Sequence, residues 1–199
     1  ELLDAYTKTA FGGRSLGEAA VVLEEMISDP KCFVVMTVSG AMTVAKQGLL
    51  ICEMIERGWI QAIVSTGALM SHGFVEGMGG VHFKHDPCMN DEELYKRGYD
   101  RVYDTLELEK NLDDTERIVR EVLEQLPEGE ILSSSSILWL LGKYFCDTLP
   151  KDNRAILKSA YQHNVPIFVP AFTDSEMGLD IEVSTSYNDY FHFQIPLSI

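Results

Sequence analysis

The sequence has few basic residues and no long apolar run. Sixteen Lys and Arg stand against 31 Asp and Glu in 199 residues, which gives a net charge of −15. This excess of acid disfavours nucleic acid and anionic membranes and favours cationic partners such as polyamines, although an acidic surface also serves solubility alone. No apolar stretch approaches the roughly 20 residues that would span a bilayer. We therefore expect a protein that binds neither nucleic acid nor membrane.

Cysteine is also scarce. No CxxC pair and no metal-type spacing occurs among the four residues, Cys32, Cys52, Cys88 and Cys146;. His82 and His85 form an HxxH pattern, but no Cys or carboxylate stands around it at ligand spacing, so we expect no metal site;. This usage of cysteine is typical of a reduced, cytoplasmic protein.

Two nucleotide-binding motifs are missing as well. The chain contains neither the GxGxxG fingerprint of dinucleotide-binding domains nor the GxxxxGK[ST] motif of a P-loop;. A nucleotide, if one binds, must therefore be held by a less common arrangement of loops.

The chain does contain three apolar runs that are rich in β-branched residues. The segments Phe33–Thr37, Ala62–Ser65 and Pro166–Val169 lack alternation, which is typical of strands buried on both faces of a parallel sheet;. Helical patterns lie between them. We expect an α/β fold, with a Rossmann-like, doubly wound, mostly parallel sheet and helices on both faces, in a single domain over residues 1–199.

Several element boundaries follow from capping signals. Ser15 with Glu18 resembles a capping box, a helix should follow the turn Ser39-Gly40-Ala41, and Ser133 to Ser136 should open another;. Further helices should be capped by Asp113 and by Asp152 or Asn153, and a short strand is expected at Arg101–Asp104. The stretch from Ile181 to Ile199 lacks a helical period and fits no regular element.

Three loops after the buried strands are the candidate binding segments: Ser39–Thr43, Thr66–Ser71 and Thr173–Gly178. Ligands of open α/β sheets bind at the carboxyl ends of the strands, and helix N-termini there suit a pyrophosphate. The alternative is that these are only the tight turns that any βα unit needs. Asp174 could accept hydrogen bonds from a ribose, hold an ammonium group or cap a turn, and His72 could be a base or a surface histidine.

The second and third loops resemble the deoxyhypusine synthase family. Thr66-Gly67-Ala68 followed by Ser71-His72 is similar to the prokaryotic pattern T-T-G-A-N-x-x-H-D, and the stretch from Pro166 to Gly178 is similar to IPVF-P-A-x-T-D-G-S-x-G-D. Gly98 to Asp104 resembles the family's GINRIGN. Gly73 and Leu179 depart from the family's aspartates. The resemblance extends from about Phe33 to Gly178.

The resemblance implies an NAD site and a polyamine site. NAD would contact Gly40, Ala41, Met42, Thr43, Val44, Thr66, Gly67, Ala68 and Asp174. Ser71 and His72 stand where eukaryotic members place two polyamine-facing carboxylates.

The resemblance also implies an activity. Family members use NAD to transfer the aminobutyl group of spermidine through an enzyme lysine to a lysine of a translation factor, and they are typically homotetramers. The family's C-terminal half, with its reactive lysine, has no counterpart after Gly178, so we assign no catalytic residue here. A homospermidine-synthase-like transferase and a non-catalytic Rossmann-like binding protein are the alternatives.

Overall fold

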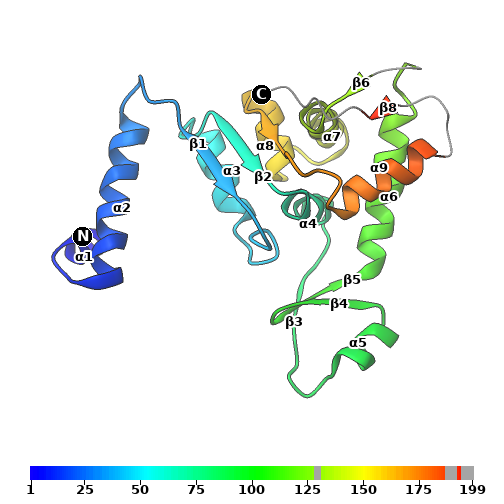
Figure 1. Cartoon of the computed structure of the whole chain (residues 1–199), viewed down its shortest axis with the longest axis horizontal. Helices are drawn as coiled ribbons and strands as arrows, with labels where there is room; N and C mark the ends of the chain where they lie inside the picture. Colours follow the sequence, from blue (N-terminus) through cyan, green and yellow to red (C-terminus); the bar gives the residue numbers. More distant parts are fainter. Residues whose placement is uncertain (128–130, 187–191, 194–199) are drawn as a thin grey trace.

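The computed structural model describes residues 1–127, 131–186 and 192–193, with side chains as far as Ile181. Its central feature is a parallel sheet of β1 (Val35–Val38), β2 (Ala62–Ser65) and β7 (Ile167–Phe168), in the order β1-β2-β7 (Figure 1). Val35 pairs with Ala62, and Ile63 pairs with Ile167. The three predicted strands and the parallel α/β class are therefore confirmed, with β7 shorter than its apolar run.

One face of this sheet is covered by helices. α3 (Gly48–Glu56) and α8 (Ile156–His163) pack against each other, and α7 (Ser134–Thr148) packs against α8 and β7. Ile63 and Ile167 point into this core, where Phe74 and Phe145 stack with ring centroids 4.5 Å apart. Burying such large apolar side chains supplies most of the driving force for this layer.

The opposite face of the sheet is more open. Val35 on β1 and Phe168 on β7 are 47% and 45% exposed. Among the described residues the neighbouring strands β1, β2 and β7 follow one another in chain order. The packed helices thus lie on the face that carries Ile63 and Ile167.

A small antiparallel sheet lies beside this layer. It contains β3 (Phe83–Lys84), β5 (Thr105–Leu108) and β4 (Tyr99–Val102) in the order β3-β5-β4, and α5 (Asp91–Lys96) precedes β4. The strand expected at Arg101–Asp104 is displaced, because Val102 pairs with Thr105 and leaves Tyr103 and Asp104 as the turn. Tyr103 has φ 58°, the positive value that tight hairpin turns require;.

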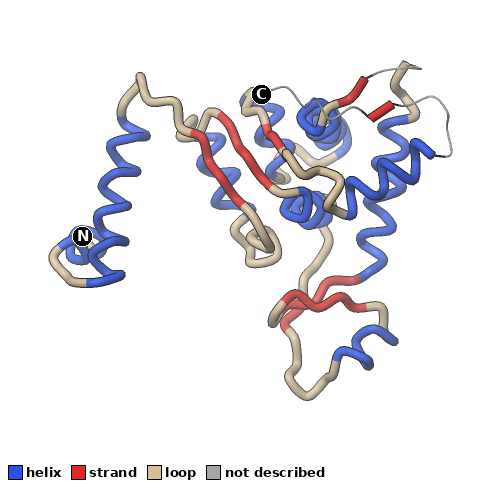
Figure 2. Tube along the Cα trace, viewed as in Figure 1, coloured by secondary structure: helices blue, strands red, loops and turns tan. Residues whose placement is uncertain are grey.

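Most of the predicted helices form, with shifted starts. α1 (Leu2–Thr7) and α2 (Phe11–Ser28) pack on each other, away from the sheet (Figures 1 and 2). Ser15 is not a cap, since its hydroxyl donates to the Phe11 carbonyl inside α2. Ser133 does cap α7, accepting from the Ser136 amide at 3.1 Å.

Other boundaries also differ from the prediction. The helix after β1 begins at Gly48, not directly after Ala41. α6 (Glu109–Leu123) begins before Asp113, and Ala155 rather than Asp152 or Asn153 is the N-cap of α8. These caps rest on backbone geometry without a side-chain hydrogen bond, so a side-chain pattern could not locate them.

The C-terminal segment corrects another expectation. α4 (Gly67–Gly77) and α6 pack against α9 (Glu176–Ser186), so the stretch after Asp180 begins as a helix. His192–Phe193 form β8, which pairs with β6 (Ile131–Leu132). The remainder of that stretch lies outside the described residues. Among the helices that the structure describes, none is long and apolar enough to cross a membrane.

Candidate functional site

The three candidate loops meet at the carboxyl ends of the parallel strands. The Thr43 hydroxyl in the first loop donates to the Leu69 carbonyl in α4 at 3.3 Å. Gly67, at the start of α4, lies so close to the third loop that a Cβ there would be 2.2 Å from Ser175 Oγ. Contacts between residues far apart in the sequence thus bring the loops together, as the position after buried strands predicts.

The first loop presents only part of the predicted cofactor set. It runs as a series of turns between β1 and α3, and Gly40 has φ 70° with open space around its Cα. Gly40 and Met42 are exposed and Ala41 is half-buried. Thr43 and Val44 are 0% and 4% exposed, so their side chains are buried and only their backbone could face NAD, and their contacts to NAD stay a prediction.

The N-terminus of α4 has no side-chain cap. Thr66 is the N-cap but makes no side-chain capping bond, and its buried hydroxyl has no hydrogen-bond partner among the described residues. No acidic residue occurs in the first turn, which begins with Gly67 and Ala68. The first amides of a helix lack intrahelical partners, and the positive end of its dipole attracts negative charge. A phosphate group therefore suits this position.

The third loop is fastened by Ser175, which sequence analysis missed. Its hydroxyl donates to the Phe172 carbonyl at 2.7 Å and accepts from the Gly178 amide at 3.1 Å, so it caps α9. Asp174 is exposed, and no hydrogen bond or ion pair involves its carboxylate in the described chain. The sequence also allows a turn cap at Asp174, but Ser175 makes the capping hydrogen bonds at this turn. A Ser followed by a Glu at the start of a helix is the signal that could have found it.

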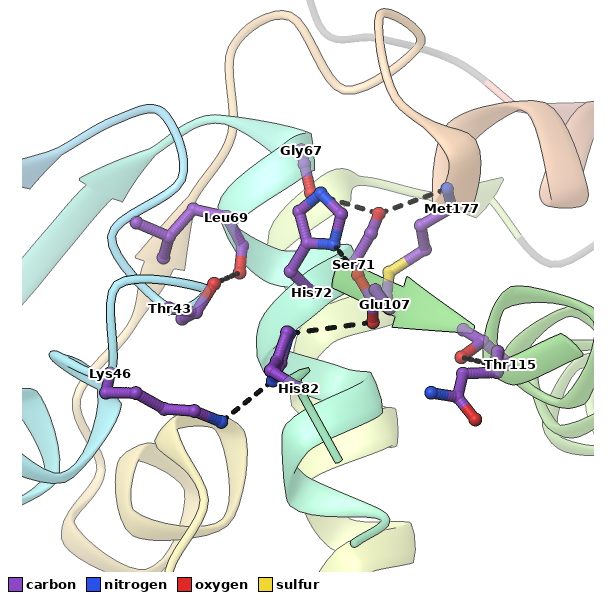
Figure 3. Close-up of polar contacts among 11 residues, drawn as sticks. Thr43, Lys46, Gly67, Leu69, Ser71, His72, His82, Glu107, Thr115 and Met177 are labelled. Atoms are coloured by element: carbon purple, nitrogen blue, oxygen red, sulfur yellow. Dashed lines mark hydrogen bonds and ion pairs between the residues drawn. The ribbon is translucent and has the colours of Figure 1, made fainter. Parts of the chain in front are cut away.

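Ser71 is buried between two helices. It is 1% exposed, its hydroxyl donates to the Gly67 carbonyl at 3.1 Å, and the same oxygen accepts from the Met177 amide at 3.3 Å (Figure 3). Ser71 therefore joins α4 to α9, and its contact with a polyamine stays a prediction.

His72 is paired with a buried carboxylate. Its Nδ1 lies 2.6 Å from Glu107 Oε2, and the two side chains are 15% and 1% exposed (Figure 3). The hydrogen bond to Glu107 raises the pKa of His72, against the opposing effect of burial. His72 is thus neither an isolated surface histidine nor a lone base, because an acid from β5 stands behind it.

A polar chain continues from Glu107 into the first loop. His82 Nε2 lies 3.8 Å from Glu107 Oε1, and its Nδ1 lies 2.8 Å from Lys46 Nζ, which also donates to Glu76 at 3.0 Å. Burial and the Lys46 ammonium lower the pKa of His82. Lys46 adopts φ 63°, which turns the end of the loop toward this chain.

Two further carboxylates lie near His72. Asp100 on β4 is the cross-strand partner of Glu107, and Glu176 begins α9. Burial raises the pKa of both Asp100 and Glu176, and His72 lowers each of them in part. Like charges directly opposite in a sheet are destabilising. His72 lies beside this pair and offsets part of the repulsion, since it lowers the pKa of Asp100 against the effect of burial.

His82, His85 and Lys158 all have other partners among the described residues. His82 is used by Lys46, and His85 Nε2 contacts the Met89 carbonyl at 3.0 Å. The described residues contain no group of three or more His, Cys, Asp or Glu arranged to hold a metal ion. Lys158 is 2% exposed but its ammonium donates to backbone carbonyls, including that of Asn153 at 2.8 Å, so it serves the fold.

Comparison with known proteins places these loops in a family. The deoxyhypusine synthase profile matches residues 1–196. The chain is 36% identical over 185 residues to "Probable deoxyhypusine synthase 2" of Methanosarcina acetivorans, covering 92% of this chain and 53% of that protein. It is 29% identical over 195 residues to "Deoxyhypusine synthase-like protein" of Coxiella burnetii, covering 98% and 55%. The chain belongs to the deoxyhypusine synthase family.

A solved structure shares the fold of this chain. The crystal structure of a "putative deoxyhypusine synthase" from Entamoeba histolytica matches with a TM-score of 0.65 at 15% identity, over 98% of this chain and 68% of that one. The chain spans about half the length of the curated relatives that it matches.

The carboxylates in this region predict that stability falls as pH rises. Burial raises the pKa of Asp180 from 3.8 to about 7, so the folded state holds a proton that the unfolded state releases. This contribution is present below about pH 4 and is lost as pH rises through about 7. The raised pKa of His72 likewise lowers stability as pH rises through neutrality. The lowered pKa of His82 has the opposite effect on stability.

We expect the free energy of unfolding to decrease by about 1 kcal/mol between roughly pH 5 and 8, a figure kept small because Asp180 is only half-buried. Denaturant titrations across this range test it. Asp180→Asn should flatten the slope, and a slope unchanged in this variant would contradict the assignment.

Proposed function

We propose that the protein, in its full-length form, uses NAD to transfer the aminobutyl group of spermidine to an acceptor amine, with a lysine of a translation initiation factor as the acceptor. The observation that carries the proposal is the convergence, at one edge of the sheet, of a helix N-terminus without a side-chain cap, the exposed carboxylate of Asp174 and His72 with its acidic neighbours. Family membership supports it further.

The residues at this edge fit NAD. The amides at Thr66, Gly67 and Ala68 would hold the pyrophosphate, and Asp174 would accept hydrogen bonds from a ribose;. The Thr66 hydroxyl, which has no hydrogen-bond partner among the described residues, would gain a polar neighbour. Gly40 lets a ligand approach the backbone of the first loop. When bound, NAD supplies a hydride acceptor for the carbon beside the amine nitrogen.

The residues around His72 fit a polyamine. Asp100, Glu107 and Glu176 place negative charge near one imidazole, and a cation is attracted to such a group;. In the proposed transfer, the bond between the secondary nitrogen of spermidine and its butyl carbon breaks. A bond from that carbon to the acceptor nitrogen forms, 1,3-diaminopropane leaves, and there is no net oxidation.

Turnover of the full-length protein tests the proposal. Spermidine and NAD are supplied with a lysine-bearing acceptor protein, with putrescine as acceptor, or with neither, and diaminopropane and the labelled acceptor are measured by mass spectrometry. We expect transfer to the protein lysine. Transfer to putrescine alone would indicate the homospermidine reaction, and release of no diaminopropane in any arm would indicate a non-catalytic protein.

Asp174→Ala should weaken NAD more than His72→Ala does. A ribose-binding carboxylate makes charge-assisted hydrogen bonds worth roughly 1.5–3 kcal/mol each, so Asp174→Ala should raise the Kd for NAD by about one to two decades. His72→Ala should leave NAD affinity nearly intact and impair amine-dependent turnover. Calorimetric titration of both variants with NAD decides this. Unchanged binding in Asp174→Ala would remove that residue from the cofactor site.

We also propose that the protein self-associates, in keeping with a homotetramer. The open face of the sheet exposes Val35 and Phe168, and α2 leaves Leu16 and Val22 53% and 57% exposed. Apolar surface of this kind is commonly covered by a partner. Light scattering at micromolar concentration should give a mass several times that of one chain, and a clean monomer would contradict the proposal.

A further inference from the structure

Glu107 is an unusual residue for the interior of a strand. Its side chain is 1% exposed, and it lies between two imidazoles, with His72 Nδ1 at 2.6 Å and His82 Nε2 at 3.8 Å (Figure 3). Burying a carboxylate is costly unless charged or hydrogen-bonding partners compensate. The protonation of the two histidines therefore decides how the charge of Glu107 is balanced.

The contact with Lys46 fixes the protonation state of the His82 ring. An ammonium group can only donate, so His82 Nδ1, 2.8 Å from Lys46 Nζ, must accept;. The ring is then neutral and carries its proton on Nε2, facing Glu107 Oε1. Because His82 brings no positive charge, Glu107 depends on His72 for its counter-charge. Lys46 itself is already paired with Glu76 at 3.0 Å.

His72 consequently has two different ring nitrogens. Nδ1 donates to Glu107 Oε2, and no hydrogen bond to Nε2 occurs in the described part of the chain. The charged groups that face His72 are Glu107 from β5, Asp100 from β4 and Glu176 from α9, with His82, Lys46 and Glu76 behind Glu107. Acidic groups dominate this surrounding, which favours the imidazolium form of His72 while no other cation is bound.

We propose that Glu107 is a positioning residue that keeps Nδ1 of His72 protonated, so that an ammonium group of a polyamine, on binding at Nε2, displaces the Nε2 proton into solvent. This inference rests on the proposed function, because it says which proton leaves when an amine binds at the proposed amine site. The ammonium keeps its own protons, donates one hydrogen bond to the freed Nε2 lone pair, and takes over the positive charge beside the carboxylates. For each ammonium group that binds beside His72, one proton is released to solvent.

The first test follows the His72 ring by NMR pH titration of the full-length protein without ligand. Glu107→Gln keeps the size and one oxygen acceptor but removes the charge, so the pKa of His72 should fall toward its ordinary value. Glu92→Gln on α5 is the matched control, because Glu92 forms only an exposed pair with Lys96 and should leave His72 unchanged. An unchanged His72 pKa in Glu107→Gln would overturn the inference.

The second test measures spermidine binding by calorimetry in two buffers of different ionisation enthalpy near neutral pH. Wild type should release protons on binding, His72→Asn should release none, and Glu107→Gln should release fewer. Binding without proton release by the wild type would overturn the inference and leave the proposed function standing. If spermidine does not bind the wild type at all, the proposed function fails together with the inference.

Discussion

Gly178→Ala is expected to lower the free energy of unfolding by about 3 kcal/mol, at the upper end of what overpacking costs. A Cβ at Gly178 would lie 2.2 Å from the Phe172 carbonyl oxygen and 2.8 Å from Thr173 Cα. Both are backbone atoms, so no side chain can rotate away. The third loop must then separate from α9, and Asp174 moves with it.

Denaturant unfolding followed by circular dichroism measures the effect, and NAD titration should show a parallel loss of affinity. Gly12→Ala is the control, since nothing lies within 4 Å of a Cβ there and Gly12 is in α2. Replacing a helical glycine by alanine should be neutral or stabilising by up to about 1 kcal/mol. Equal stabilities for the two variants would contradict the close packing of the third loop.

Glu107→Ala is expected to destabilise the fold by about 3 kcal/mol, because removing one partner of a buried pair leaves the other uncompensated. The carboxylate is 1% exposed and accepts from His72 at 2.6 Å, and the His82 Nε2 proton would lose its nearest acceptor. Denaturant titration measures the loss.

Glu93→Ala is the control for this change. It removes an exposed pair with Arg97 at 2.5 Å, and such surface pairs contribute about 0–1 kcal/mol;. If Glu107→Ala proves no more destabilising than the control, Glu107 does not hold the antiparallel sheet against α4.

The parallel sheet could be predicted from the sequence because its signal is local. The runs Ala62–Val64 and Pro166–Val169 consist of apolar residues without alternation, which is typical of a strand in a parallel sheet;. The three loops followed from those strands, since the carboxyl ends of parallel strands share one edge. The contacts of Gly40, Gly67 and Asp174 in these loops with NAD stay a prediction that the family resemblance implies.

Glu107 could not be predicted because its signal is not local. It is 35 residues from His72, and the alternation of polar and apolar residues over Thr105–Leu108 is typical of a glutamate that faces solvent;. The burial of Ser71, Thr43 and Val44 was missed for a related reason. A loop sequence does not say which side chains the neighbouring elements cover, and here α4 and α9 cover them.

Hydrogen–deuterium exchange of the full-length protein, with and without NAD, tests the central claim most directly. The account predicts slower exchange in three segments far apart in the sequence: residues 39–46, 65–70 and 171–178. The small antiparallel sheet around Glu107 should respond to spermidine rather than to NAD. Protection by NAD confined to other segments, or no protection in any of the three, would contradict the assignment of this sheet edge as the cofactor site.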